Sequence, residues 1–178
     1  MRPARDFFRP LAVGAPNPPI EIPFPPSRMI HFFPPSNEKM RSKVPQIAPT
    51  VDILLANLED GVPADQKEAA RAGMIDVANH PDSASTFGQT QFWTRVNSLD
   101  SPWCLDDITA AVLECADALD VIMIPKVEGP EDIHYVDRLL AQLEAKAGRT
   151  EPLLVHAILE TARGVANVEE ICAASPRM

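Results

Sequence analysis

The sequence has few glycines, few cysteines and fewer bases than acids, and each shortage excludes a class of protein. Only 7 of its 178 residues are glycine, and no GxGxxG or GxxxxGK[ST] pattern follows an apolar run, which argues against a dinucleotide site or a P-loop. The sequence has three cysteines, Cys104, Cys115 and Cys172, which are widely spaced and form no CxxC pair. This usage indicates free thiols in a cytoplasmic protein rather than a disulfide framework or a zinc site.

Positive charge and long apolar runs are also scarce. Sixteen basic residues face twenty-five acidic ones, for a net charge of −9, which argues against nucleic acid as the main partner. No apolar run approaches the roughly 18–20 residues that span a bilayer. The first residues are basic but lead into proline instead of an apolar segment, so we expect neither a secretory signal nor a membrane partner.

Proline is the residue in excess. Twelve of the 19 prolines lie in the first fifty residues, where they prevent helix formation and remove the donors that a central strand needs. We therefore interpret residues 1–27 as an extended arm and residues 28–178 as the folded domain. The arm is either an unattached tail or a segment docked through apolar side chains such as Phe7, Phe8 and Phe24.

Apolar runs and helical periodicity alternate through the rest of the chain. Strands are predicted over residues 29–33, 51–58, 91–97, 121–124 and 153–159, and helices over 63–78, 103–118, 131–147 and 165–174. This alternation is typical of βαβ units on a parallel sheet with both faces covered. The fold class is therefore α/β, either an open doubly wound sheet or a parallel (β/α)₈ barrel that is incomplete here, because a closed barrel needs about 250 residues.

Polar and charged residues end four of the predicted strands or come just after them. In parallel α/β folds the ligand site lies at the carboxyl ends of the strands, so we expect these side chains to meet at one rim. In chain order they are Glu59 and Asp60, Arg95 with Asn97, Lys126 with Glu128, and Glu160.

Each of these residues also has a purely structural interpretation. Asp60 with Gly61 could form only a turn, and Lys126 with Glu128 could mark only the exit of a strand to solvent. Glu160 could merely offset a helix dipole, with Thr161 as the N-cap. Arg95 lies in an apolar, aromatic strand and needs a partner there, so an internal ion pair with Glu59 or Asp60 is its structural alternative.

One arginine and several carboxylates at a shared rim also suit a divalent cation with a carboxylate substrate. Mg²⁺ prefers oxygen ligands and retains waters, so one or two protein carboxylates are enough. A bidentate 2-oxo acid can fill the remaining positions, while an arginine neutralises the negative charge that develops on its keto oxygen. The four histidines form neither HxH nor HExxH and do not compete as a metal site.

Four segments, in this order, resemble the HpcH/HpaI aldolase and citrate lyase β-subunit superfamily. They are residues 58–71 (LEDGVPADQKEAAR), 95–103 (RVNSLDSPW), 124–128 (IPKVE) and 158–165 (ILETARGV). The malyl-CoA lyase-like branch is the most similar one, since residues 168–171 (VEEI) and 174–177 (ASPR) also resemble it. The resemblance covers about residues 29–178.

The resemblance implies a (β/α)₈ barrel that binds Mg²⁺, or Mn²⁺, at its carboxyl face and forms or breaks a carbon–carbon bond between an acyl-CoA and a 2-oxo acid. It places Glu160 on a metal-ligand glutamate and Arg95 on the arginine that contacts the substrate. Glu59 and Asp60 fall on an acidic pair near the metal, and Lys126 on a substrate-side lysine. The complete protein would be a cytoplasmic homo-oligomer, a trimer or hexamer.

The chain departs from the family pattern at three places. The second metal ligand of the family is an aspartate roughly 25 residues beyond Glu160, which falls past Met178. The loop after the first strand, residues 34–39 (PPSNEK), lacks the glycine and arginine associated with CoA binding. Asn57 stands where the family often has aspartate.

The sequence therefore predicts the N-terminal part of a Mg²⁺-dependent lyase for malyl-CoA, citramalyl-CoA or citryl-CoA, with the 178-residue chain inactive by itself. A malyl-CoA thioesterase is one alternative, which would release free malate without glyoxylate. A non-catalytic assembly fragment is another, and it would not be stabilised by Mg²⁺ with a 2-oxo acid. A metal-free phosphate-binding barrel is disfavoured because no glycine-rich loop is present.

Overall fold

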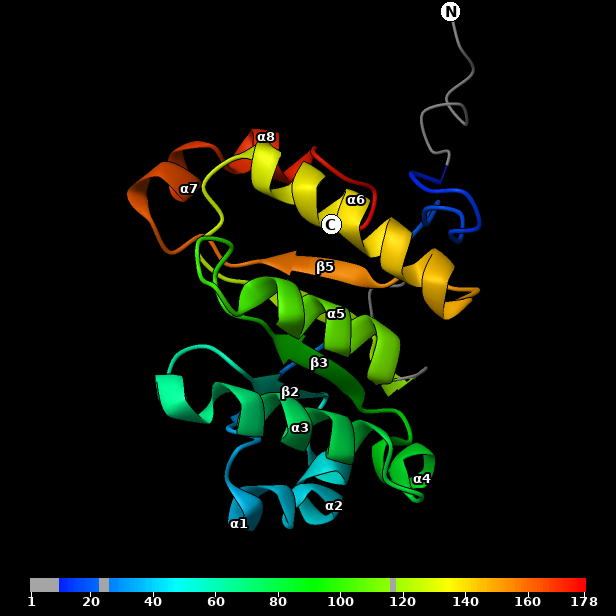
Figure 1. The fold of residues 1–178 in the computed structure, drawn as a ribbon, viewed down its shortest axis with the longest axis vertical. Helices are drawn as coiled ribbons and strands as arrows, with labels where there is room; N and C mark the ends of the chain where they lie inside the picture. The colour runs from blue at the N-terminus through cyan, green and yellow to red at the C-terminus, as the bar shows by residue number, and fades with distance from the viewer. Residues whose placement is uncertain (1–9, 23–25, 116–117) are drawn as a thin grey trace, which may run out of the picture.

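Five parallel strands form the centre of the protein. The computed structural model describes residues 10–22, 26–115 and 118–178 (Figure 1). The strands pair with their neighbours in chain order, β1-β2-β3-β4-β5, and every pair is parallel. Their bounds are β1 Ile30–Phe33, β2 Ile53–Asn57, β3 Gln91–Arg95, β4 Val121–Ile124 and β5 Leu154–Ala157.

The connections between the strands contain the helices. The three longer ones are α3 (Lys67–Ala78), α5 (Cys104–Glu114) and α6 (Pro130–Ala147), and each follows a different strand. The shorter helices are α1 (Glu38–Arg41), α2 (Val44–Ile47), α4 (Ser83–Phe87), α7 (Ala162–Ala166) and α8 (Val168–Cys172), with single 3₁₀ turns at Ala48–Thr50 and Ala64–Gln66. The parallel β-helix-β order gives the expected α/β class.

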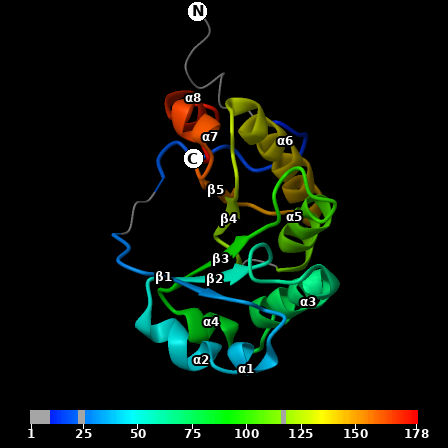
Figure 2. The same cartoon turned by 90° about the vertical axis from the view of Figure 1, so that its left-hand side faces the viewer.

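Helices α3, α5 and α6 lie side by side along one face of the sheet (Figure 2). Alternate strand residues, among them Leu54, Phe92 and Ile122, point into this layer and are fully buried. Burying a side chain of this size is worth about 1.5–3 kcal/mol, so this interface is the main core.

The opposite face of the sheet is not covered by helices of the described chain (Figure 2). Ile53, Trp93 and Val121 line a hollow of about 760 Å³ on this side, which Ile22 and Met178 also border. A five-stranded sheet with one uncovered face matches the expectation of an incomplete barrel, because the interior of a closed barrel is filled by side chains from all eight strands.

The strand predictions agree with the structure to within two residues at each end. The helix predictions agree less well. The helix expected over 165–174 is wrong as a single element, because the chain breaks at Asn167 into α7 and α8. Helices α1, α2 and α4 were not expected, and the helix expected over 103–118 ends at Glu114, with residues 116–117 outside the described part.

The proline-rich arm is described over residues 10–22 and 26–27, and these stretches contain neither helix nor strand. Its Gly14 lies against Ala145 of α6, which favours the docked arm over the unattached tail. Residues 1–9 and 23–25, including Phe7, Phe8 and Phe24, lie outside the described residues. The division into an arm and a domain stays a prediction. Within the described chain, no helix is both long and apolar enough to cross a membrane.

Candidate functional site at the carboxyl edge of the sheet

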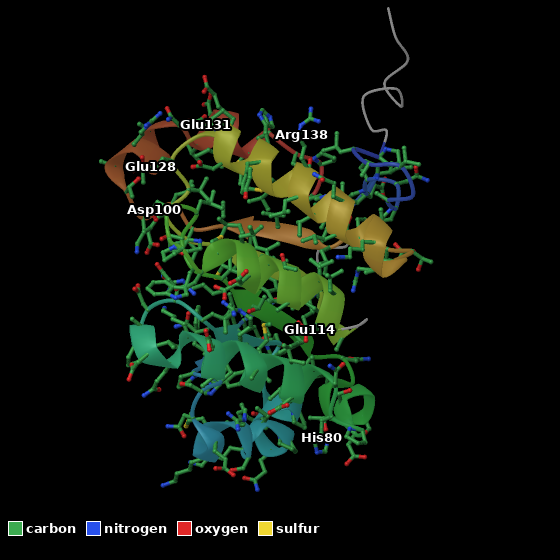
Figure 3. All side chains as sticks on the ribbon, viewed as in Figure 1. His80, Asp100, Glu114, Glu128, Glu131 and Arg138 are labelled. Atoms are coloured by element: carbon green, nitrogen blue, oxygen red, sulfur yellow. The ribbon has the colours of Figure 1, made fainter. Side chains whose placement is uncertain are left out.

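The loops that follow β2, β3, β4 and β5 all emerge at one end of the sheet. Asp100, Glu128 and Glu131 lie toward this end, whereas Glu114 and His80 lie toward the other (Figure 3). The strand register pairs Asn57 with Arg95 and Arg95 with Met123. The last residues of neighbouring strands therefore stand side by side, and the side chains that follow them can meet.

Arg95, the last residue of β3, is at the centre of this cluster. It is 9% exposed. Its Nη2 forms an ion pair with Glu59 and lies 3.2 Å from Asp60 Oδ2 and 3.6 Å from Glu160 Oε1. Its Nε is buried and has no acceptor among the described residues. The expected convergence of acids and a guanidinium from separate strands is therefore present, and the expected internal ion pairs of Arg95 are part of it.

Glu59 follows β2 and joins two cations. It is 6% exposed, with Oε2 paired to Arg95 and Oε1 accepting a hydrogen bond from Lys126 Nζ at 2.7 Å. The hydrogen bond and the charge of Glu59 raise the pKa of Lys126 above its ordinary value, so this lysine stays protonated at neutral pH and is unsuited to act as a base. Glu59 thus has one oxygen hydrogen-bonded to Lys126 and the other ion-paired with Arg95, and it is the group that holds these two cations in place.

Glu160 and Lys126 are linked through the backbone. Glu160 follows β5, and its Oε1 accepts a hydrogen bond from the Lys126 main-chain N–H at 3.2 Å. Thr161 caps α7, as expected, because its hydroxyl accepts from the Gly164 N–H at 3.0 Å. The Glu160 side chain is 34% exposed, so one carboxylate of the cluster faces outward beside Arg95.

Asn97 and Glu128 were expected at the rim and do not join the cluster. Asn97 is buried, and both its main-chain N–H and its amide donate to Asp107 Oδ2, at 3.0 and 2.6 Å. Arg71 of α3 holds the other oxygen of Asp107 at 3.0 Å. Glu128 instead faces Arg163 at 3.7 Å. Asn97 therefore anchors the loop that carries the site, and Glu128 is a surface residue beside it.

Lys67 is the residue of this region to which the sequence assigned no role. It is buried at the start of α3, where its Nζ donates to the carbonyl oxygens of Leu58 and Glu59, both at 2.8 Å. Its ammonium also lies 5.4 Å from the centre of the Trp103 ring, a cation–π contact. Burial lowers the pKa of Lys67 from its ordinary value. Its place in the 58–71 segment was the signal that could have identified it.

A small hollow adjoins the cluster. It has a volume of about 290 Å³ and lies between the loops after β3, β4 and β5, with Leu99, Lys126 and Thr161 among the residues that line it. Lys126 is the cluster residue that lines it, and Arg95 and the three carboxylates do not, so the hollow lies beside the rim on the Lys126 side.

The oxygen donors of the site are few for a metal centre. No three His, Cys, Asp or Glu side chains of the described residues are arranged to hold a metal ion together. Glu59 is committed to Arg95 and Lys126, which leaves the outward-facing carboxylates of Glu160 and Asp60. This set fits a hard cation that keeps several waters, and it does not form a closed protein cage.

A family model for "HpcH/HpaI aldolase/citrate lyase" matches residues 28–178. The chain belongs to this family. Its relatives include the malyl-CoA/β-methylmalyl-CoA/citramalyl-CoA lyase of Chloroflexus aurantiacus, which is 55% identical over 98% of this chain and 49% of its own length. The L-malyl-CoA/β-methylmalyl-CoA lyase of Cereibacter sphaeroides is 39% identical over 86% of this chain and 46% of its own. The chain thus spans about half the length of the relatives it matches.

Solved structures of the same fold cover the same part of this chain. RipC from Yersinia pestis superposes with a TM-score of 0.61 at 26% identity over 85% of this chain and 55% of its own. The citrate lyase β-subunit of Mycobacterium tuberculosis, complexed with oxaloacetate and magnesium, superposes with a TM-score of 0.58 at 26% identity. This match covers 83% of this chain and 53% of the M. tuberculosis chain. The family resemblance and the fold class expected from the sequence are confirmed.

The Chloroflexus match also includes the proline-rich arm, although the resemblance noted from the sequence covered only about residues 29–178. It extends over 175 of the 178 residues, so nearly all of residues 1–27 align with that lyase. The arm is therefore shared with at least one member of the family.

Proposed function

We propose that this chain is part of a Mg²⁺-dependent carbon–carbon lyase that cleaves or forms malyl-CoA or a related 3-hydroxyacyl-CoA. The observation that carries the proposal is the cluster in which Arg95 Nη2 lies within 4 Å of carboxylates from the loops after β2 and β5. The names of the Chloroflexus and Cereibacter relatives support this choice of substrate. A 2-oxo acid and an acyl-CoA would be the partners of the reaction.

The proposed metal ligand of this chain is Glu160, with Asp60 close enough to bind a water of the metal. The M. tuberculosis protein was solved with magnesium and oxaloacetate, which supports Mg²⁺ over the other expected ion, Mn²⁺. When bound, the metal would act as a Lewis acid on the oxygen that becomes the keto group. Glu160 suits this role because its carboxylate is 34% exposed and lies 3.6 Å from Arg95 Nη2.

Arg95 would bind the oxygen that becomes the keto oxygen of the 2-oxo acid, and it would stabilise the negative charge that this oxygen carries as an alkoxide before cleavage or after condensation. Its guanidinium is held by Glu59 and Asp60, so it is oriented before substrate arrives, which is the condition for electrostatic stabilisation of a transition state. Its Nε has no acceptor among the described residues, and this leaves a donor for an oxygen that these residues do not supply.

Lys126 and Glu59 would complete the charge balance around the substrate. Lys126 stays protonated beside Glu59 and can bind a carboxylate of the 2-oxo acid, while Glu59 keeps the two cations a fixed distance apart. Neither is proposed as the proton-transfer group. The expected oligomer and the cytoplasmic location of the complete protein stay predictions.

A chimaeric enzyme tests the proposal. Residues 1–178 would replace the matched half of the Chloroflexus lyase, and malyl-CoA with Mg²⁺ would be assayed for glyoxylate and acetyl-CoA. We expect turnover, and a fall of about 10²–10³-fold in kcat for Glu160→Gln and for Arg95→Met, the range seen when one stabilising group is removed. Glu114→Gln, at the far end of the sheet (Figure 3), is the control and should keep full activity.

Two results would contradict the proposal. One is a folded chimaera that releases free malate without glyoxylate, which is the outcome of a thioesterase. The other is a folded chimaera that neither turns over nor gains thermal stability with Mg²⁺ and oxaloacetate, the outcome of an assembly fragment.

A further inference from the structure

The loop between β4 and α6, residues 125–129 (the β4–α6 loop), has an unfavourable backbone conformation at Lys126, the residue that contacts Glu59 and Glu160. Lys126 has φ of 54°, and among the described residues no other non-glycine residue has a positive φ. A lysine adopts this region reluctantly because its Cβ crowds the backbone. Such a conformation persists only where the surroundings impose it, and it is often found at functional sites.

Helix α7 approaches this loop so closely that a side chain is excluded. A Cβ placed on Gly164 would lie 2.3 Å from the carbonyl oxygen of Val127, well inside contact distance. Only glycine permits this approach. The contact brings the backbone of α7 directly onto the residue that follows Lys126.

A hydrogen bond joins the end of α7 to the β4–α6 loop at Glu128, the residue after Val127. The side-chain amide of Asn167 donates to the carbonyl oxygen of Glu128 at 2.8 Å. Asn167 is also the residue at which α7 ends and α8 begins. The break in the C-terminal helix therefore places this amide over the β4–α6 loop.

The clamped segment is the one that contacts Glu160. The Val127 N–H donates to Ile158 O at 3.3 Å, and the Lys126 N–H donates to Glu160 Oε1. The position of Lys126 Nζ beside Glu59 depends on the same backbone. The β4–α6 loop is thus joined to the chain before Glu160, at Ile158, and to the chain after it, at Gly164 and Asn167.

We propose that α7 acts as a clamp on the β4–α6 loop, with Gly164 and Asn167 as positioning residues that hold Lys126 and Glu160 in their places. The clamp itself is a statement about this chain, and its effect on catalysis rests on the proposed lyase function. Groups that orient active-site residues from behind contribute about 10–100-fold to activity in comparable sites, and small displacements of reacting groups are costly.

The first test uses the 178-residue chain and measures amide hydrogen exchange residue by residue. Asn167→Asp keeps the shape of the side chain and removes the donor. We expect the Lys126 and Val127 amides to exchange about tenfold faster, the effect of losing one hydrogen bond. Asn79→Asp is the matched control, because the Asn79 amide likewise donates to a backbone carbonyl, that of Glu114, at 2.6 Å. It should leave both amides unchanged.

Gly164→Ala is the second variant, since its added methyl should displace the loop directly and accelerate the same two amides. Equal exchange of Lys126 and Val127 in wild type, Asn167→Asp and Gly164→Ala would overturn the clamp. So would acceleration of these amides to the same extent in Asn79→Asp, because the effect would then reflect general destabilisation.

The second test measures the consequence for catalysis in the active chimaera. Asn167→Asp should lower kcat about tenfold at an unchanged content of folded protein, and Asn79→Asp should not. An active chimaera that is insensitive to Asn167→Asp would overturn the positioning role and leave the lyase proposal intact. A chimaera without any lyase activity would count against the proposed function, and the exchange measurement would still decide the clamp.

Discussion

At the scale of single residues, the site is organised around a carboxylate that touches two cations. Glu59 is buried, and its oxygens are divided between Arg95 and Lys126. A buried charge is tolerated when it is paired and hydrogen-bonded. Removing one partner of such a pair is destabilising because the other charge stays buried without compensation. The stability of this rim therefore depends on Glu59 more than on the acids around it.

Glu59→Gln should lower the free energy of unfolding by about 3 kcal/mol, within the range of about 3–5 kcal/mol for breaking a buried ion pair. The value lies at the low end because Lys126 is half-exposed and Arg95 keeps Asp60 and Glu160 nearby. Urea unfolding followed by circular dichroism would measure it. Glu128→Gln, whose partner Arg163 is exposed, should change stability by less than about 0.5 kcal/mol, and an equal loss in the two variants would contradict the argument.

The cysteines differ in reactivity for a physical reason. Burial raises the pKa of the Cys104 thiol and of the Cys115 thiol to about 12, so neither forms the reactive thiolate at pH 8. Cys172 is exposed. A thiol reagent at pH 8 should therefore label one cysteine, Cys172, in the native chain and all three in denaturant. Fast native labelling of Cys104 or Cys115 would show that α5 is not packed as described.

At the scale of elements, buried polar contacts fix how the loops leave the sheet. Asp107 of α5 accepts from Arg71 of α3 and from Asn97 after β3, and it is fully buried. Lys67 of α3 holds the loop after β2 in a similar way, by donating to the carbonyl oxygens of Leu58 and Glu59. Each of these contacts joins a helix to the loop that carries a site residue, so the helices position the rim as well as covering the sheet.

Asp107→Ala should destabilise the chain by about 3–5 kcal/mol, because it leaves Arg71 without its carboxylate and Asn97 without its acceptor. Asp106→Ala is the matched control, since Asp106 lies in the same first turn of α5 and is exposed. It should cost no more than about 1 kcal/mol, through the helix dipole. Thermal or urea unfolding would compare the two, and similar losses would refute the role of the buried network.

At the scale of the whole molecule, the C-terminal segment is held by a buried ionic network. Arg177 is 3% exposed and contacts Asp137 at 2.6 Å and Glu144 at 2.7 Å, both from α6. It also donates to Leu153 O, and its own carbonyl accepts from the Val155 N–H. The chain therefore runs back beside β5 at this point, and the network ties α6, β5 and the C-terminal segment into one unit.

Arg177→Gln should cost about 3–5 kcal/mol, because Asp137 and the fully buried Glu144 would lose their shared counter-charge. Arg138→Gln is the control, as Arg138 lies on the exposed side of the same helix (Figure 3) and should cost less than about 0.5 kcal/mol. Chemical denaturation would measure both. A small effect of Arg177→Gln would mean that the segment is not tied to α6 in solution.

The strands and the rim could be predicted from the sequence because both depend on local order. Short apolar runs separated by helical periodicity specify parallel strands, and the carboxyl ends of parallel strands meet at one edge. Arg95 ends a strand, and Glu59, Asp60, Lys126 and Glu160 lie within three residues after one, so chain order alone placed them together. Their roles as metal, substrate and catalytic residues stay predictions.

Other features were decided only by the tertiary structure, because they depend on contacts between residues far apart in the chain. Asn97 lies two residues after Arg95, the last residue of β3, yet its hydrogen bond to Asp107 holds it away from the rim. Glu128 forms an ion pair with Arg163 instead of joining the cluster. The C-terminal helix breaks at Asn167, whose side chain donates a hydrogen bond to the Glu128 carbonyl oxygen. Periodicity and motif order determined which loops form the site, whereas the packing of α3, α5 and α7 against those loops determined which side chains enter it.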